Sequence, residues 1–243
     1  GVSMTGIASG KVLELDMKEA AKHVKTMNAT VSKTIGIKKA ARCTTVKPAG
    51  TTSLVLGTSS GIHAWHNRYY VRRIRVGKNE AIYGYLNTNH PELLEDDYFR
   101  PHDTAVISIP QQAPKGSITR KESSQDLLER VKNVASNWVR PGHRIGSNTH
   151  NVSATISLKE NDWEEAGEWM WKNRDHYNGL SVLPYDGGTY VQAPFEDINK
   201  KEYDKMTKTL CDVDLTKIVE EFDDTDLSSE LACAGGSCEI TSL

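Results

Sequence analysis

The chain has 243 residues, a hydrophobic content of 37%, a charged content of 26% and a formal net charge of −2, which is typical of a globular protein with a sizeable core. These values argue against a membrane protein, because no apolar run approaches the roughly 20 residues that a bilayer requires, and the first residues lack the regions of a signal peptide. Four cysteines in a chain of this length are too few for a secreted disulfide framework, so we expect a cytoplasmic location and no membrane partner.

The first predicted elements are a helix and a short strand. Asp16 with Glu19 three residues later starts a helix that ends near Gly36. Residues 44–47 form a short strand that breaks at Pro48 into a loop of small and hydroxyl residues. Further strands are predicted at 70–76, where Ile74 and Val76 oppose the arginines, at 104–110 and at 151–158.

Two later helices have clear capping signals. Ser123 with Asp126 starts one whose inner face carries Leu127, Leu128, Val131, Val134, Ala135 and Trp138. Asn161 with Glu164 starts the other, with an inner face of Trp163, Ala166, Gly167, Met170 and Trp171. Residues 179–190, "GLSVLPYDGGTY", then offer a short buried strand and a turn. Alternating strands and helices predict an α/β fold with an at least partly parallel sheet.

Charge is distributed unevenly along the chain. The first 80 residues carry 14 Lys or Arg against 4 Asp or Glu, a net of +10, and the remaining 163 residues carry a net of −12. A basic first third is consistent with an anionic ligand such as phosphate, and equally with a solvated basic surface. From Ile218 onward there are seven acidic residues and no Lys or Arg, which is typical of a solvated tail.

The stretch 47–53, "KPAGTTS", is the first candidate site. A phosphate needs several converging donors, and small residues let backbone N–H groups approach it while Thr and Ser hydroxyls add more. The Gly-Lys-Ser/Thr ending of a Walker A loop is missing. An ordinary strand-to-helix loop remains the alternative.

His63 and His66 are three residues apart, a spacing that binds metal on a helix, but no further ligand with suitable spacing lies close in sequence. We therefore expect no metal site there. Tyr69 and Tyr70 are adjacent on a predicted strand, so their side chains are expected on opposite faces.

Cys233 and Cys238 lie near the end of the sequence with Gly235 and Gly236 between them. A structural disulfide would close too small a ring to stabilise much, and a zinc site would need a second spaced pair. Thiol–disulfide exchange is the favoured interpretation, and a pair of inert surface thiols is the alternative.

Together these stretches resemble the C-terminal part of class II, adenosylcobalamin-dependent ribonucleotide reductase, of the ribonucleoside-triphosphate reductase type. The similar stretches are "GVSMTGI", "TTVKPAGTTSLVLGTSSGIH", "RIGSNTHNVSATISLKENDWEEAGEWMW", "GLSVLPYDGGTYVQAPFE" and "CAGGSC". The resemblance implies an oxidoreductase that converts ribonucleotides to deoxyribonucleotides by thiyl-radical chemistry. It also implies the later part of a ten-stranded α/β barrel followed by a flexible acidic C-terminal tail.

The resemblance further implies roles for particular residues. Pro48, Ala49, Gly50, Thr51, Thr52 and Ser53 would bind the substrate phosphates. Cys233 and Cys238 would be a dithiol that re-reduces the active site and is itself reduced by thioredoxin. Residues 1–195 would be the partial catalytic barrel, and residues 196–243 the C-terminal extension with the redox tail. Adenosylcobalamin would be the cofactor of the complete enzyme, with no contacting residue assigned here and no nucleic-acid polymer as partner.

One family motif is missing. The radical cysteine of the family lies in an Asn-x-Cys-x-Glu loop, and neither Cys43 nor Cys211 has those neighbours. The upstream part of the same enzyme would therefore be a partner, and this chain alone is expected to be inactive. The alternatives are a fragment of a class I large subunit, disfavoured because "SVLPYDGG" has no tyrosine pair, and a non-catalytic anion-binding module with a redox-sensing tail.

Overall fold

The computed structural model describes residues 1–185, 187, 190–210 and 212–220, apart from the side chains of residues 51 and 54. It divides into two compact units, each treated separately below. Unit 1 comprises residues 1–65 and 114–186, and unit 2 comprises residues 66–113 and 187–243. The boundary predicted at residue 195 separates a partial catalytic barrel from a C-terminal extension. It concerns the roles of these parts in an enzyme, which the two compact units do not test, so it stays a prediction.

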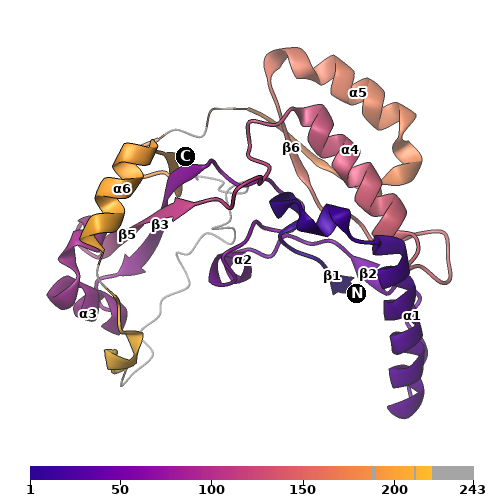
Figure 1. Ribbon diagram of the computed structural model, residues 1–243, viewed down its shortest axis with the longest axis horizontal. Helices are drawn as coiled ribbons and strands as arrows, with labels where there is room; N and C mark the ends of the chain where they lie inside the picture. The colour runs from indigo at the N-terminus through magenta and orange to yellow at the C-terminus, as the bar shows by residue number, and fades with distance from the viewer. Residues whose placement is uncertain (186, 188–189, 211, 221–243) are drawn as a thin grey trace. The chain divides into compact units, whose positions relative to one another are not determined.

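Unit 1 pairs short parallel strands with three longer helices (Figure 1). Its elements are β1 (Val2–Ser3), η1 (Ile7–Ser9), η2 (Lys11–Glu14), α1 (Met17–Thr34), β2 (Thr44–Thr45), α2 (Thr51–Val55), α4 (Ser124–Val134), the π-helix η4 (Ala135–Val139), β6 (Thr155–Leu158), η5 (Glu160–Asp162), α5 (Trp163–Lys172), η6 (Arg174–His176) and β7 (Ser181–Pro184). β1 runs parallel to β2, and β6 runs parallel to β7. A parallel bridge between Val46 and Val152 links the two pairs, which confirms the predicted α/β class with parallel strand pairing.

The core of unit 1 follows the sequence pattern. The capping box of Ser123 and Asp126 is present at the start of α4, and the predicted inner face is buried: Leu127, Leu128, Val131, Val134, Ala135 and Trp138. These side chains pack against Val152, Ala154, Ile156 and Leu158 at and before β6. Trp138 Nε1 donates to the carbonyl of Thr45 (2.9 Å), and Thr44 Oγ1 donates to the carbonyl of Trp138 (2.7 Å), so the helix and β2 satisfy each other's buried polar groups.

Two predictions about faces were wrong in part. In α5, Ala166 is buried and Met170 packs against the core as predicted, but Trp163 and Trp171 are 45% and 73% exposed. The buried tryptophan is Trp169, because only one of the tryptophans of this helix faces the core. β7 was expected to be buried, but Leu183 is 42% exposed and the only paired strand described for β7 is β6, so little covers it.

Unit 2 is an antiparallel sheet with the strand order β4-β5-β3-β8. Its elements are β3 (Tyr69–Gly77), α3 (Ala81–Asn89), η3 (Pro91–Leu93), β4 (Leu94–Asp96), β5 (Thr104–Gln112), β8 (Phe195–Asp197), α6 (Lys200–Thr209) and η7 (Leu215–Lys217). The predicted strands at 70–76 and 104–110 are thus confirmed. Val76 is buried, but Ile74 on the same face is 41% exposed and Arg72 is buried, so the face is less apolar than the sequence suggested.

The adjacent tyrosines lie on opposite faces of β3, as expected. The Tyr69 ring contacts Tyr203 of α6, whereas the buried Tyr70 lies beside His66 and Phe195. Burial raises the pKa of Tyr70 to about 12. This tyrosine therefore stays neutral at physiological pH and fills space in unit 2.

Candidate functional site: the loop after β2

The predicted phosphate loop lies in unit 1, after β2, and its last three residues form the first turn of the short helix α2. Pro48 is exposed, Ala49 and Gly50 are half-buried, and Thr52 is exposed. Ser53 is 2% exposed, and its hydroxyl donates to the carbonyl of Gly50 (2.6 Å). The loop thus presents Thr52 to solvent and uses Ser53 to fix its own turn.

Two consecutive amides of the loop converge on one oxygen. The N–H groups of Ala49 and Gly50 both donate to Ser60 Oγ, at 2.9 and 3.3 Å. Paired backbone donors aimed at one point are the arrangement that binds an anionic oxygen. The Ser60 hydroxyl is therefore the point at which two loop amides meet. This role of Ser60 was not predicted.

Residues near the start of the chain bind the segment 59–61, which lies beside this loop. Thr5 Oγ1 donates to the carbonyl of Ser59 (3.0 Å) and accepts from the N–H of Gly61 (2.9 Å). The N–H of Gly6 also donates to the carbonyl of Ser59 (2.9 Å). The "GVSMTGI" stretch that contributed to the resemblance is thereby given a structural role, which is to fix residues 59–61 beside the loop.

His63 connects the same segment to β6. Its Nε2 accepts from the N–H of Thr155 (3.0 Å), so Nδ1 carries the proton and donates to the carbonyl of Ser60 (3.3 Å). Burial lowers the pKa of His63, and the charge of Arg130 lowers it further, against an opposing effect of the Ser60 carbonyl. The imidazole is therefore neutral and acts as a structural link. No group of three or more His, Cys, Asp or Glu placed to hold a metal ion occurs within the described ranges.

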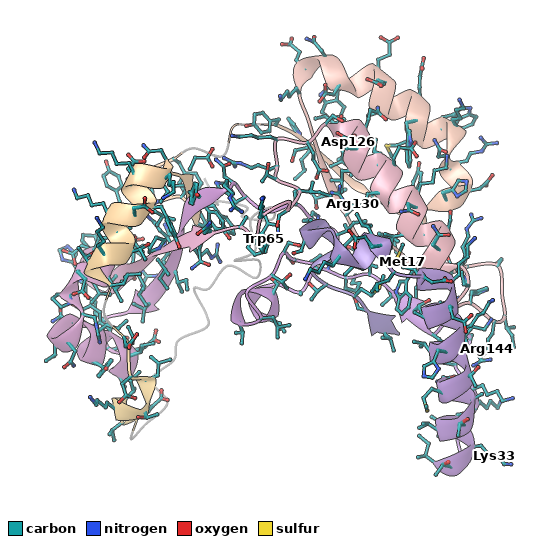
Figure 2. All side chains as sticks on the ribbon, in the orientation of Figure 1. Met17, Lys33, Trp65, Asp126, Arg130 and Arg144 are labelled. Atoms are coloured by element: carbon teal, nitrogen blue, oxygen red, sulfur yellow. The ribbon has the colours of Figure 1, made fainter. Side chains whose placement is uncertain are left out.

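Arg130, which is labelled in Figure 2, extends from α4 and supports the segment that carries His63. Its guanidinium makes two hydrogen bonds to the carboxylate of Glu122, at 2.6 and 2.7 Å, and its Nε donates to the carbonyl of Ile62 (3.3 Å). The side chains of Arg130 and Glu122 are only 6% and 11% exposed. A buried charge pair thus fixes the backbone one residue before His63.

The neutral state of His63 gives a pH-dependent stability. The folded pKa lies below the unfolded value of 6.5, so the unfolded chain binds the proton first as pH falls. We expect the contribution of His63 to be complete above pH 6.5 and to be lost as pH falls toward the folded pKa. Urea midpoints measured from about pH 7.5 to about pH 5 should fall more steeply for the wild type than for His63→Gln. Equal slopes for the two proteins would contradict this role.

Other predicted site residues are placed apart from the loop or outside the described structure. His66 belongs to unit 2, where its Nε2 pairs with Asp197 Oδ1 at 2.9 Å. Cys43 is a buried free cysteine. Cys211, Cys233 and Cys238 lie outside the described residues. None of the helices within the described part of the chain is long and apolar enough to cross a bilayer.

Comparison with known proteins supports the resemblance. No family model matches the chain. It is 26% identical over 212 residues to the adenosylcobalamin-dependent ribonucleoside-triphosphate reductase of Lactobacillus leichmannii, covering 86% of this chain and 28% of that protein. It is 27% identical over 226 residues to a probable adenosylcobalamin-dependent ribonucleoside-triphosphate reductase of Dictyostelium discoideum, covering 87% and 27%.

A solved structure shares the fold. The crystal structure of a B12-dependent, class II ribonucleotide reductase matches with a TM-score of 0.67 and 22% identity, covering 86% of this chain and 33% of that one. The chain thus spans between a quarter and a third of the length of the proteins that it matches. It is similar to part of the adenosylcobalamin-dependent ribonucleoside-triphosphate reductases, which confirms the resemblance indicated by its sequence motifs.

Proposed function

We propose that this chain is part of an adenosylcobalamin-dependent ribonucleotide reductase and forms the later part of its ten-stranded α/β barrel. The observation that carries the proposal is the similarity to these reductases over 86% of the chain. The parallel strand pairs of unit 1 are consistent with a segment of such a barrel. Because the chain spans so little of its relatives, we expect it to reduce no ribonucleotide without the rest of the enzyme.

Within this enzyme, the loop Pro48–Ser53 would bind the phosphates of the ribonucleotide. The amides of Ala49 and Gly50 donate to Ser60 Oγ in this structure. A phosphate oxygen that took the place of this hydroxyl would accept both hydrogen bonds, which supports the role. The exposed Thr52 would add a hydroxyl. Holding the substrate by its phosphates keeps the ribose at a fixed place, which turns a chance encounter into a unimolecular reaction.

Adenosylcobalamin, when bound in the complete enzyme, would supply the radical that starts the reaction. Two cavities among the described residues have volumes of about 410 and 440 Å³ and are lined largely by charged or aliphatic side chains. A cavity of this size holds a drug-sized ligand and is too small for a corrin ring with its nucleotide. We therefore assign no cofactor-binding residue to this chain.

Cys233 and Cys238 would deliver the electrons that ribonucleotide reduction consumes. In each turnover the 2′ hydroxyl leaves as water, and two thiols of the active site become a disulfide. A thiolate of the pair would attack that disulfide, and the second thiol would complete the exchange, so that two electrons and two protons pass to the active site. The resulting Cys233–Cys238 disulfide would be reduced by thioredoxin.

Triphosphate binding tests the loop. Isothermal titration of the chain with CTP and with inorganic triphosphate should show binding that Thr52→Val weakens at least about 10-fold, because a hydroxyl bonded to a charged group contributes about 1.5–3 kcal/mol. Thr88→Val, at an exposed threonine of α3, is the matched control and should leave affinity unchanged. Equal affinity of Thr52→Val and wild type would remove Thr52 from the site.

Thiol trapping tests the cysteine pair. After mild oxidation, alkylation followed by mass spectrometry should find a Cys233–Cys238 disulfide that reduced thioredoxin opens. A chain in which this disulfide never forms, or resists thioredoxin, would refute the electron-delivery role.

A further inference from the structure

The hydroxyl of Ser60 occupies the point at which the loop donors converge. Its Oγ accepts from the N–H of Ala49 (2.9 Å) and from the N–H of Gly50 (3.3 Å). An anionic oxygen bound to a pair of backbone amides would make these same two contacts. Ser60 therefore already supplies the loop with the acceptor that a phosphate would supply.

The donors are held in place by the loop itself. The carbonyl of Ala49 accepts from the N–H of Thr52 (3.1 Å), and the carbonyl of Gly50 accepts from the N–H and the hydroxyl of Ser53, at 3.3 and 2.6 Å. The N–H of Gly50 belongs to the same planar peptide unit as the carbonyl of Ala49. The bond to Thr52 thus sets the direction of this N–H, and the donor keeps that direction whichever oxygen accepts from it.

The backbone that carries Ser60 is held on both sides. Thr5 Oγ1 donates to the carbonyl of Ser59 (3.0 Å) and accepts from the N–H of Gly61 (2.9 Å). The carbonyl of Ser60 accepts from the backbone N–H of His63 (3.0 Å) and from its Nδ1 (3.3 Å). Because this backbone is fixed, the hydroxyl can leave the two amides by rotation about the Cα–Cβ bond, from one staggered position to another.

We propose that Ser60 is an internal competitor for the phosphate position of the loop: its hydroxyl holds the two amides, and a phosphate oxygen binds by displacing it. The inference rests on the proposed phosphate-binding role of the loop. In such a competition the intrinsic affinity is multiplied by the fraction of molecules in which the position is open. One hydrogen bond shifts such an equilibrium by about 2- to 13-fold, so the two bonds of Ser60 should lower the affinity for triphosphate measurably.

Removing the hydroxyl is therefore expected to strengthen binding. In isothermal titration of the full chain with inorganic triphosphate, Ser60→Ala should bind at least about 3-fold more tightly than the wild type, and CTP should show the same factor. Ser60→Thr keeps a hydroxyl and should bind no more tightly than the wild type. Ser3→Ala is the matched control, because Ser3 Oγ accepts from the N–H of Lys47 (3.0 Å), an amide outside the converging pair. Its affinity should equal that of the wild type.

Hydrogen exchange supplies a measurement that needs no ligand. Without triphosphate, the amides of Ala49 and Gly50 should exchange at least about 5-fold faster in Ser60→Ala than in the wild type, because they have lost their acceptor. Ser3→Ala should accelerate exchange at Lys47 and leave the other two amides unchanged.

The outcomes separate this inference from the phosphate site itself. If the wild type binds triphosphate and Ser60→Ala binds it equally or more weakly, the competition is overturned and the loop remains a phosphate site. If neither protein binds triphosphate, the phosphate site is refuted and the competition fails with it. Wild-type exchange rates at Ala49 and Gly50 in Ser60→Ala would also overturn the inference, since the hydroxyl would then not hold these amides.

Discussion

Replacing Arg130 with methionine is expected to lower the free energy of unfolding by about 3–5 kcal/mol, because the change leaves the carboxylate of Glu122 buried without its partner. The two side chains share two short hydrogen bonds and are almost fully buried. Arg130 also holds the carbonyl of Ile62, so the segment that carries His63 should loosen. Urea denaturation followed by tryptophan fluorescence measures the loss.

A second variant and a control distinguish charge from packing. Adding Glu122→Gln to Arg130→Met should recover at least half of the lost stability, since the unpaired charge is then gone. Lys22→Ala removes an ion pair with Glu19 whose side chains are 69% and 73% exposed, and it should cost less than about 1 kcal/mol. If the double variant is no more stable than Arg130→Met, the pair contributes to the free energy of unfolding through packing and not through its charges.

Replacing Gly61 with alanine is expected to lower both stability and triphosphate affinity, although the change adds only one methyl group. Gly61 has a φ of +55°, and an added Cβ would lie 2.8 Å from the carbonyl oxygen of Lys47. The left-handed conformation costs about 1–2 kcal/mol for other residues, and overpacking against rigid backbone adds about 1–3 kcal/mol. Because Lys47 immediately precedes the proposed phosphate loop, triphosphate affinity should fall at least 10-fold together with stability.

Gly57 offers a matched control for this prediction. Its φ is +61°, but an added Cβ would meet nothing within 4 Å. Gly57→Ala should therefore show the conformational cost alone, about 1–2 kcal/mol, with triphosphate affinity close to that of the wild type. Similar losses of affinity in both variants would mean that the contact between Gly61 and Lys47 does not position the loop.

Local signals in the sequence predicted much of the fold. The helix starts at Asp16 and Ser123 were predicted because a capping side chain and the backbone N–H that donates to it are only three residues apart in sequence. The buried set of α4 followed from its 3.6-residue period. The faces of α5 and β7 were misread, because which side of an element is covered depends on neighbours that are distant in sequence.

The candidate site was predicted only in part. The loop Pro48–Ser53 was identified from its small and hydroxyl residues, but its neighbours were not. Ser60 accepts hydrogen bonds from the loop amides, and Thr5 and His63 bond to the backbone of residues 59–61. Such bonds leave no spacing pattern in a sequence. Glycines at positions 6 and 61 were the available signal. Both have a positive φ, and an added Cβ would contact the Thr58 side chain at Gly6 and the Lys47 carbonyl at Gly61.

The most direct test of the account is a residue-resolved titration of the chain with CTP. We predict progressive chemical-shift changes at the amides of Ala49, Gly50 and Thr52 and at Ser60. Inorganic triphosphate should shift a subset of these same signals. Amide shifts confined to other parts of the chain, or no shifts at millimolar nucleotide, would contradict a substrate phosphate site in the loop after β2.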